Sequence, residues 1–183
     1  MRKLTHAELL QRQTEQPPSK LPFTTVLNNI RSLYNVGSIF RTADGAGVEK
    51  LWLCGLTGIP PDTKISKTAL GAENAVPWEY SRHALDCVRV LKSSGYQIVL
   101  LEQTQRSLPY QEFVPQSPVA LVLGNEISGV SEELLELCDQ AIEIDMAGLK
   151  NSLNVTVAFG IVAYHIKNQI KTQDTGHKTQ EVK

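Results

Sequence analysis

The sequence predicts an α/β fold in which helices flank a mostly parallel sheet. Apolar or β-branched runs with the length of strands alternate with runs of helical spacing, a pattern typical of parallel sheets covered on both faces. Residues 119–123 (VALVL) are all apolar, as expected for a strand in the centre of such a sheet. The 183 residues are enough for one domain of this class with a full core.

Five strands are expected where short apolar or β-branched segments lie between turn signals. They are residues 23–27, 50–54, 96–101, 119–123 and 141–144. A long loop is expected over residues 55–65, which contain Pro60-Pro61. A doubly wound dinucleotide-binding fold is disfavoured, because the sequence contains neither a G-x-G-x-x-G motif after the first strand nor a P-loop.

Helices are expected where apolar residues recur at helical spacing or where capping residues occur. They are residues 5–12, 35–46, 82–94, 131–138 and 155–170. Asn35 is a favoured N-cap for the second of these, and Gly47 is a favoured stop. The last helix is apolar over more than one face, which fits burial against both its own core and a second subunit.

The chain is expected to form one domain between two polar ends. Residues 1–20 contain a short helix and an extension, residues 21–170 form the domain, and residues 171–183 lack a core pattern. Such a polar terminal segment is expected to be mobile.

The charge and cysteine content favour a protein of a reducing compartment. A formal net charge of −1 disfavours a large, sequence-blind nucleic-acid binder but permits local basic clusters. Cys54, Cys87 and Cys138 are scattered and odd in number, which indicates free thiols and a cytoplasmic location. We expect no membrane span, because no apolar run approaches about 20 residues, and no metal site, because the four histidines lack ligand spacing.

A Gly/Ser/Asn-rich turn lies between a strand-like run and a helical run at residues 148–158 (GLKNSLNVTVA). A turn of this kind exposes backbone N–H groups at a helix N-terminus, which can hold a polar ligand. Ser152 and Asn154 can both cap the helix that follows. Taken alone, the segment is equally well explained as a capped helix start without a ligand.

Two further segments change that interpretation: residues 35–48 (NVGSIFRTADGAGV) and residues 121–130 (LVLGNEISGV). In this order the three segments resemble the motifs of the SpoU (TrmH-like) branch of the SPOUT RNA methyltransferases, over residues 22–167. The resemblance implies a SPOUT (α/β knot) fold with a C-terminal trefoil knot, a homodimer and S-adenosylmethionine as cofactor. It also implies methylation of ribose 2′-hydroxyls in tRNA or rRNA.

The resemblance assigns catalysis to five residues. Arg41 acts on the ribose 2′-hydroxyl with support from Asn35, Glu126 organises the substrate side, and Ser152 and Asn154 supply a hydroxyl and a bracing amide. Arg41 acts either as a base or as a fixed cation beside the developing alkoxide; because a guanidinium would need strong help from its surroundings to act as a base, the cation is the safer assignment. The alternatives are an ion pair of Arg41 with the aspartate three residues later, and a Glu126 that is only a hydrated loop carboxylate.

The cofactor is expected in the loops that follow three strands. Backbone contacts map onto Gly124, Ile144 and Leu153, Met146 lines the pocket, and Gln103 and Thr104 belong to the first loop. Gly124 would let the chain approach the cofactor closely. An in-line methyl transfer from a sulfonium needs no metal.

Residues 67–74 (KTALGAEN) resemble a segment common in the same family and are expected to form a loop near the site, although an ordinary surface turn explains them too. The sequence therefore predicts an RNA 2′-O-ribose methyltransferase. One alternative is a catalytically silent RNA- or ribosome-binding module on the same fold. A nucleotide-dependent enzyme acting on a small molecule is a weaker one, because the nucleotide-binding motifs are absent.

Overall fold

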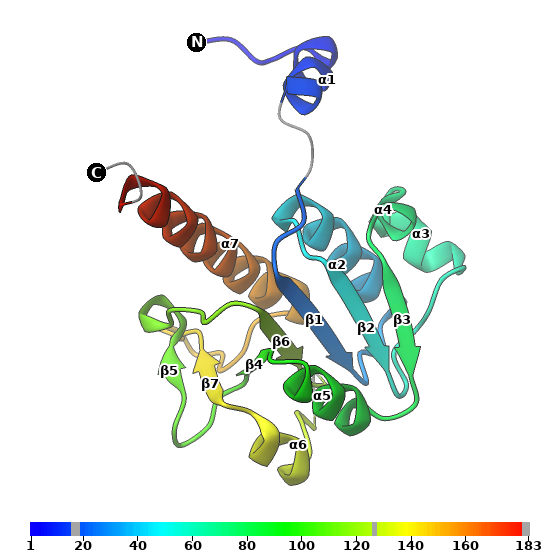
Figure 1. The fold of residues 1–183 in the computed structure, drawn as a ribbon. Helices are drawn as coiled ribbons and strands as arrows, with labels where there is room; N and C mark the ends of the chain where they lie inside the picture. Colours follow the sequence, from blue (N-terminus) through cyan, green and yellow to red (C-terminus); the bar gives the residue numbers. More distant parts are fainter. Residues whose placement is uncertain (16–18, 126–127, 181–183) are drawn as a thin grey trace.

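The structure is a computed structural model that describes residues 1–15, 19–125 and 128–180 (Figure 1). Within them lies a seven-stranded sheet in the order β3-β2-β1-β6-β4-β7-β5, in which every neighbouring pair is parallel. The strands are β1 (Phe23–Asn28), β2 (Lys50–Cys54), β3 (Trp78–Ser81), β4 (Gln97–Leu101), β5 (Leu108–Pro109), β6 (Val119–Leu123) and β7 (Gln140–Glu143). The predicted class, a mostly parallel sheet flanked by helices, is confirmed.

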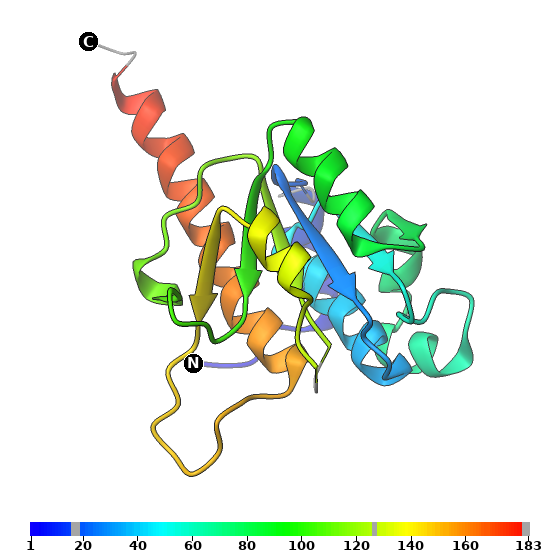
Figure 2. The same cartoon turned by 90° about the horizontal axis from the view of Figure 1, so that it is seen from below.

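Helices cover both faces of this sheet (Figures 1 and 2). They are α1 (His6–Glu15), α2 (Leu33–Ala46), α3 (Thr63–Ala69), α4 (Ala72–Ala75), α5 (Ala84–Ser93), α6 (Glu132–Leu137) and α7 (Val155–Gln180), with a 3₁₀ turn at Tyr110–Glu112. Helices α2 and α7 pack on one face, and α3 and α4 contact α2. Helices α5 and α6 pack on the other face.

The sheet separates two hydrophobic cores. Along β6, Val119, Leu121 and Leu123 belong to the core under α2 and α7, whereas Ala120 and Val122 belong to the core under α5 and α6. Successive side chains of a strand point to opposite faces, so a strand buried on both faces has no position for a polar residue. This is why the whole of β6 is apolar.

Helix α2 begins earlier than predicted. Its N-cap is Ser32, whose Oγ accepts a hydrogen bond of 3.3 Å from the backbone N–H of Asn35. The prediction of Asn35 as the cap was wrong, because serine and asparagine cap equally well and the helix takes the earlier residue. The predicted stop is confirmed, since Gly47 has a φ of 78° in the left-handed region.

The region between β2 and β3 is more ordered than predicted. The expected loop over residues 55–65 contains the start of α3, where the carboxylate of Asp62 accepts a hydrogen bond of 2.7 Å from the N–H of Lys64. Residues 67–74 form the end of α3 and most of α4 rather than a loop. They pack against α2, where the hydroxyl of Thr68 donates a hydrogen bond of 3.0 Å to the carbonyl of Tyr34.

Strands β3 and β5 were missed because both are short and lie at the edges of the sheet. Helix α7 continues to Gln180, beyond the predicted end at residue 170. The strand order, with β6 between β1 and β4, is compatible with the knotted threading that the family resemblance implies. The knot itself and the domain limits stay predictions.

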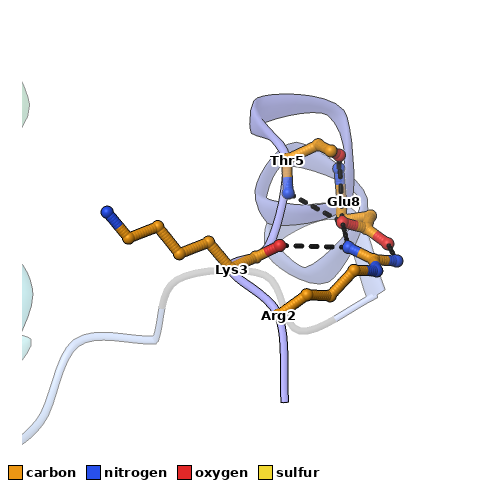
Figure 3. A network of polar contacts seen from close by, with 4 residues as sticks. All are labelled: Arg2, Lys3, Thr5 and Glu8. Atoms are coloured by element: carbon orange, nitrogen blue, oxygen red, sulfur yellow. Dashed lines mark hydrogen bonds and ion pairs between the residues drawn. The ribbon is translucent and has the colours of Figure 1, made fainter.

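Helix α1 lies apart from the rest of the molecule and is stabilised by its own polar contacts (Figures 1 and 3). The N–H of Thr5 donates to Oε2 of Glu8 (2.7 Å), and the N–H of Glu8 donates to Oγ1 of Thr5 (3.3 Å). This reciprocal arrangement is a capping box. The guanidinium of Arg2 also pairs with Glu8, and this hydrogen bond, ahead of those from Thr5, lowers the pKa of Glu8 to about 2.

Candidate active site

Because all the strands are parallel, their carboxyl ends meet at one edge of the sheet, where α/β folds place their ligands. Recesses lined by described residues open along this edge. A turn after β6 lies between two of them: the backbones of Asn125 and Gly129 exchange two hydrogen bonds of 3.0 and 2.9 Å. On one side of the turn, Nδ2 of Asn125 donates to the carbonyl of Asn29 (2.8 Å). On the other side, a Cβ placed on Gly129 would lie 2.8 Å from Oε2 of Glu102.

The first recess, here named the β4–β7 cavity, has a volume of about 340 Å³. The ends of β4 and β7 and the segment before α7 form its walls. Its lining residues are Leu101, Glu102, Gln103, Glu143, Ile144, Met146, Asn151, Ser152, Leu153 and Ala158. The structure thus brings together five of the residues predicted from the sequence, namely Gln103, Ile144, Met146, Ser152 and Leu153.

A further cavity of about 350 Å³ adjoins the β4–β7 cavity and extends it toward residues 145–150. The side-chain amide of Gln103 spans the opening, since its Nε2 donates a hydrogen bond of 2.8 Å to the carbonyl of Asn151. The first loop and the Gly/Ser/Asn-rich turn are therefore in direct contact, although 48 residues separate the two bonded positions in sequence.

Two of the predicted cofactor residues do not line this cavity. The N–H of Thr104 donates to Oγ of Ser107 (2.8 Å), and Thr104 faces a different recess, beside α6 and β7. An added Cβ on Gly124 would lie 2.8 Å from the carbonyl carbon of Gly129. Close packing against the turn thus explains this glycine, and a role of Thr104 or Gly124 in cofactor binding stays a prediction.

Asn154 connects the start of α7 to the start of α2. Its Oδ1 accepts hydrogen bonds from the N–H and the hydroxyl of Thr156 (2.8 and 2.7 Å), so Asn154 caps α7. Its Nδ2 donates to Oδ1 of Asn35 at 3.4 Å. The first and third predicted motifs, which lie far apart in sequence, therefore meet beside the β4–β7 cavity.

Arg41 lies farther along α2, and its side chain is exposed. Six residues separate it from Asn35, about 9 Å along a helix axis. Within the described part of the chain, the Arg41 guanidinium makes no hydrogen bond or ion pair, so the alternative pairing with Asp44 is not observed. Arg41 lines neither cavity described above. Its charge is thus available to a partner outside its own chain.

Helices α2 and α7 run side by side beyond this point (Figure 1). The Nζ of Lys167 donates a hydrogen bond of 2.7 Å to the carbonyl of Gly45 and lies 4.9 Å from the centre of the Tyr164 ring. Burial, together with the charge of Lys171, lowers the pKa of Lys167. This contact joins α7 to the last turn of α2, the helix that carries Arg41.

Comparison with known proteins decides the family. The model of the SpoU rRNA Methylase family matches residues 22–164. The chain belongs to this family. It is 34% identical over 143 residues to the tRNA (guanosine(18)-2′-O)-methyltransferase of Aquifex aeolicus, which covers 78% of this chain and 67% of that protein.

Solved structures agree with this assignment. The crystal structure of the A. aeolicus TrmH/SpoU tRNA modifying enzyme is similar with a TM-score of 0.79 and 29% identity, over 92% of this chain and 85% of that one. The AdoMet-bound rRNA methyltransferase from Sinorhizobium meliloti is similar with a TM-score of 0.77 and 28% identity, over 84% and 58%. The chain spans 61–67% of the length of the first curated relatives that it matches.

Three carboxylates near the site were not singled out from the sequence. Glu102 and Glu143 line the β4–β7 cavity, and Asp145 lines the cavity that adjoins it. Oε1 of Glu102 accepts a hydrogen bond of 3.0 Å from the N–H of Gln103. These carboxylates could have been found from the sequence by their position at the ends of β4 and β7, since strand ends at this edge hold ligands. Glu102 and Glu143 make the β4–β7 cavity acidic, which favours a positively charged ligand, whereas Asp145 shares the adjoining cavity with Lys150.

Glu126, the predicted residue of the second motif, lies outside the described residues. Its described neighbour Asn125 accepts a hydrogen bond of 3.0 Å at Oδ1 from the N–H of Ser128. Across the described ranges, no cluster of three or more His, Cys, Asp or Glu side chains could hold a metal ion. None of the described helices combines the length and the apolar character needed to cross a bilayer.

Proposed function

We propose that this chain is an S-adenosylmethionine-dependent methyltransferase that acts on the ribose 2′-hydroxyl of a tRNA or rRNA nucleotide. One observation carries the proposal: the third SpoU motif forms a wall of the β4–β7 cavity, and its Asn154 contacts Asn35 of the first motif. The A. aeolicus relative methylates a tRNA guanosine at the 2′-oxygen, as its name states. A cytoplasmic location, expected from the free thiols, fits this substrate.

The walls of the β4–β7 cavity fit the proposed cofactor. Cavities of about 300–1,000 Å³ lined by apolar groups and a few polar ones are typical small-molecule sites, and this one has about 340 Å³. Leu101, Ile144 and Leu153 offer apolar contacts, while Glu102 and Glu143 offer negative charge to the cationic sulfonium and ammonium groups. The backbones of Ile144 and Leu153 and the side chain of Met146 would hold the cofactor. When bound, it supplies an electrophilic methyl group.

The residues of α2 would act on the nucleophile. A ribose hydroxyl becomes a good nucleophile as its proton leaves, and a fixed cation stabilises the alkoxide that develops. We assign this role to Arg41, because a guanidinium is a planar cation that can stabilise an alkoxide without accepting its proton. Asn35 and Asn154 hold the start of α2 against the cavity, and Ser152 presents its hydroxyl at the cavity wall.

A homodimer would complete the site. Val157 and Tyr164 lie seven residues apart on one side of α7 and are 49% and 44% exposed, an apolar stripe of the kind that marks an interface. Tyr164 lies against Gly45 of α2, and Arg41 precedes Gly45 by one turn on the same side. Arg41 therefore flanks the stripe, and a two-fold contact through α7 and part of α2 would cover it. Sedimentation at micromolar concentration tests the dimer, and a clean monomer mass would refute it.

The proposed function is tested by a single substitution in two assays. Arg41→Ala should abolish transfer of a labelled methyl group to bulk RNA while calorimetry with S-adenosylhomocysteine shows an unchanged affinity. Losing a fixed charge at the reacting oxygen should cost at least about 3 kcal/mol, a factor of at least ~100 in rate. Arg41→Lys should also largely fail, because an ammonium does not reproduce the planar guanidinium.

The matched control is Arg106→Ala, which removes an exposed arginine that lines neither cavity of the site. This variant should keep the wild-type rate. If Arg41→Ala retained more than about a tenth of that rate, a loss of under ~1.4 kcal/mol, the assignment would be wrong. RNA binding without any methyl transfer by the wild type would instead favour the silent RNA-binding module.

A further inference from the structure

The second recess at the carboxyl edge of the sheet has no role in the proposed methyl transfer. This recess, here named the β1–β3 cleft, has a volume of about 680 Å³ and is larger than the β4–β7 cavity. The ends of β1, β2 and β3 form its floor, and the start of α5 and the turn after β6 form its walls. It therefore occupies the half of the carboxyl edge that the β4–β7 cavity leaves open.

The floor of the cleft offers an unused hydrogen-bond donor. Asn28, the last residue of β1, is only 9% exposed and lines the cleft. Its Oδ1 accepts a hydrogen bond of 3.1 Å from Nδ2 of Asn29. Within the described part of the molecule, its own Nδ2 donates to no protein acceptor. A nearly buried amide with free N–H groups in a cleft calls for a ligand that supplies acceptors.

The wall formed by α5 adds positive charge. Arg82 and His83 precede the helix and line the cleft, and no ion pair or side-chain hydrogen bond engages either side chain among the described residues. No side chain caps α5 at His83, so its first N–H groups remain open to the solvent side. A helix N-terminus beside a free guanidinium favours an anion.

Two carboxylates limit how much negative charge the cleft can accept. Asp86 lines the cleft but is compensated by Arg89, whose Nη1 lies 3.6 Å from Oδ1 of Asp86. Glu133 lies on the opposite wall and is exposed. This arrangement suits a ligand with a single negative charge and several neutral acceptors better than a free phosphate dianion. A phosphodiester-linked nucleotide has this chemistry, because each linkage carries one charge and the sugar and base add acceptors.

We propose that the β1–β3 cleft binds one phosphodiester-linked nucleotide of the RNA, close in the strand to the nucleotide whose ribose is methylated. The identification of the ligand as RNA rests on the proposed function. Two described residues of the turn after β6 lie between the cleft and the β4–β7 cavity: Asn125 donates to the carbonyl of Asn29 on one side, and Gly129 lies close to Glu102 on the other. An RNA strand that crosses this turn can place one nucleotide in the cleft and a neighbouring nucleotide at the opening of the cavity that we assign to the cofactor.

The first test compares two exposed arginines, one in the cleft and one outside it. Binding of fluorescein-labelled bulk tRNA is measured by anisotropy for the wild type, Arg82→Ala and the control Arg106→Ala, which removes the same charge from a residue that does not line the cleft. Arg82→Ala should weaken binding at least fivefold and lower the slope of log affinity against log salt by about 1. Arg106→Ala should stay within twofold. Equal effects of the two variants, or no binding by the wild type, overturn the proposal.

The second test locates the RNA and excludes a free nucleotide as the ligand. Ultraviolet cross-linking of the bound tRNA followed by mass spectrometry should identify peptides that contain residues 82–86 or 128–131. Millimolar adenosine 5′-monophosphate should fail to displace the RNA; displacement would make the cleft a mononucleotide site and overturn the proposal, as would cross-links confined to other surfaces.

Both tests report on RNA binding alone. A protein that binds RNA through the cleft but transfers no methyl group would refute the proposed function and leave the cleft assignment intact. Calorimetry with S-adenosylhomocysteine should show the same affinity for the wild type and Arg82→Ala, because Arg82 lies outside the β4–β7 cavity. A parallel loss of that affinity would mean that the substitution disturbs the whole carboxyl edge, and would overturn the assignment of Arg82 to a separate site.

Discussion

Asn154 performs two tasks that substitution can separate. Its Oδ1 caps α7 through two contacts with Thr156 at 2.8 and 2.7 Å, and its Nδ2 reaches Oδ1 of Asn35 at 3.4 Å. Asn154→Ala removes both tasks. Asn154→Ser keeps a good N-cap, because serine and asparagine rank together as caps, but its side chain is too short to reach Asn35.

The expected loss of stability follows from these contacts. Removing an N-cap costs about 1 kcal/mol, and the long, exposed bond to Asn35 is worth about 0.5 kcal/mol. Asn154→Ala should therefore lower the free energy of unfolding by about 1.5 kcal/mol, equal to about 3–6 °C in Tm for a chain of this size. Asn154→Ser should lose only about 0.5 kcal/mol.

Activity should respond differently from stability. If the contact with Asn35 positions α2 against the β4–β7 cavity, both variants should lose at least about tenfold in methyl transfer, because misplacement by about 1 Å costs up to ~100-fold. Thermal unfolding and the labelled-methyl assay measure the two effects independently. Equal destabilisation by alanine and serine would refute the capping argument, and near wild-type activity of Asn154→Ser would refute the positioning argument.

Three further predictions concern packing and ionisation. Gly37→Ala should destabilise by about 2 kcal/mol in chemical denaturation, because its Cβ would lie 2.2 Å from the carbonyl oxygen of Ile65; the control Gly160→Ala, whose nearest contact is at 3.8 Å, should be neutral or stabilising by up to about 1 kcal/mol. The pKa of Glu8 is lowered from 4.5 to about 2, so its stabilisation of α1 is complete above pH 4.5 and is lost as the pH falls toward 2. Amide protection factors in α1, taken relative to the intrinsic exchange rate at each pH, should fall over that window, and Glu8→Gln should remove this change. Burial, then the charge of the neighbouring aspartate, raises the pKa of Cys138 to about 11, so its alkylation rate should keep rising beyond pH 9, where an ordinary thiol levels off.

The elements that could be predicted are those whose burial is uniform. Strand β6 is apolar throughout because each of its faces lies under a helix layer, and this pattern is visible in the sequence alone. Strand β3 (WEYS) was missed, because its central residues are exposed at the sheet edge and carry no apolar signal. The start of α2 was displaced because Ser32 and Asn35 are both favoured caps, and local preference does not choose between them.

The site was predictable only where a motif places its residues on the cavity wall. Ser152 and Leu153 belong to the turn before α7 and line the cavity directly. Gly124 belongs to the second motif, but its missing side chain makes room for Gly129 in the turn after β6. Sequence patterns show that a glycine is required, whereas only the packing shows which neighbour requires it.

The contacts of Asn29 explain why the β1–β3 cleft could not be predicted from the sequence. It adopts a φ of 60°, a left-handed conformation that asparagine tolerates better than most residues. Its Oδ1 accepts a hydrogen bond of 2.9 Å from the N–H of Leu56, and its carbonyl accepts the bond from Asn125. A side chain on Gly55 would collide with it, at 2.2 Å from its Oδ1. One residue thus joins the loops after β1, β2 and β6.

The strand order explains why these contacts lie between the cleft and the β4–β7 cavity. Because β6 pairs with β1 on one side and with β4 on the other, the turn that follows β6 necessarily stands in the middle of the carboxyl edge. The same turn is fastened to Asn29 on the side of the cleft and lies against Glu102 on the side of the cavity. Asn125 and Gly129 therefore connect the cleft to the cavity that we assign to the cofactor, and a ligand that displaced either residue would change the shape of both recesses.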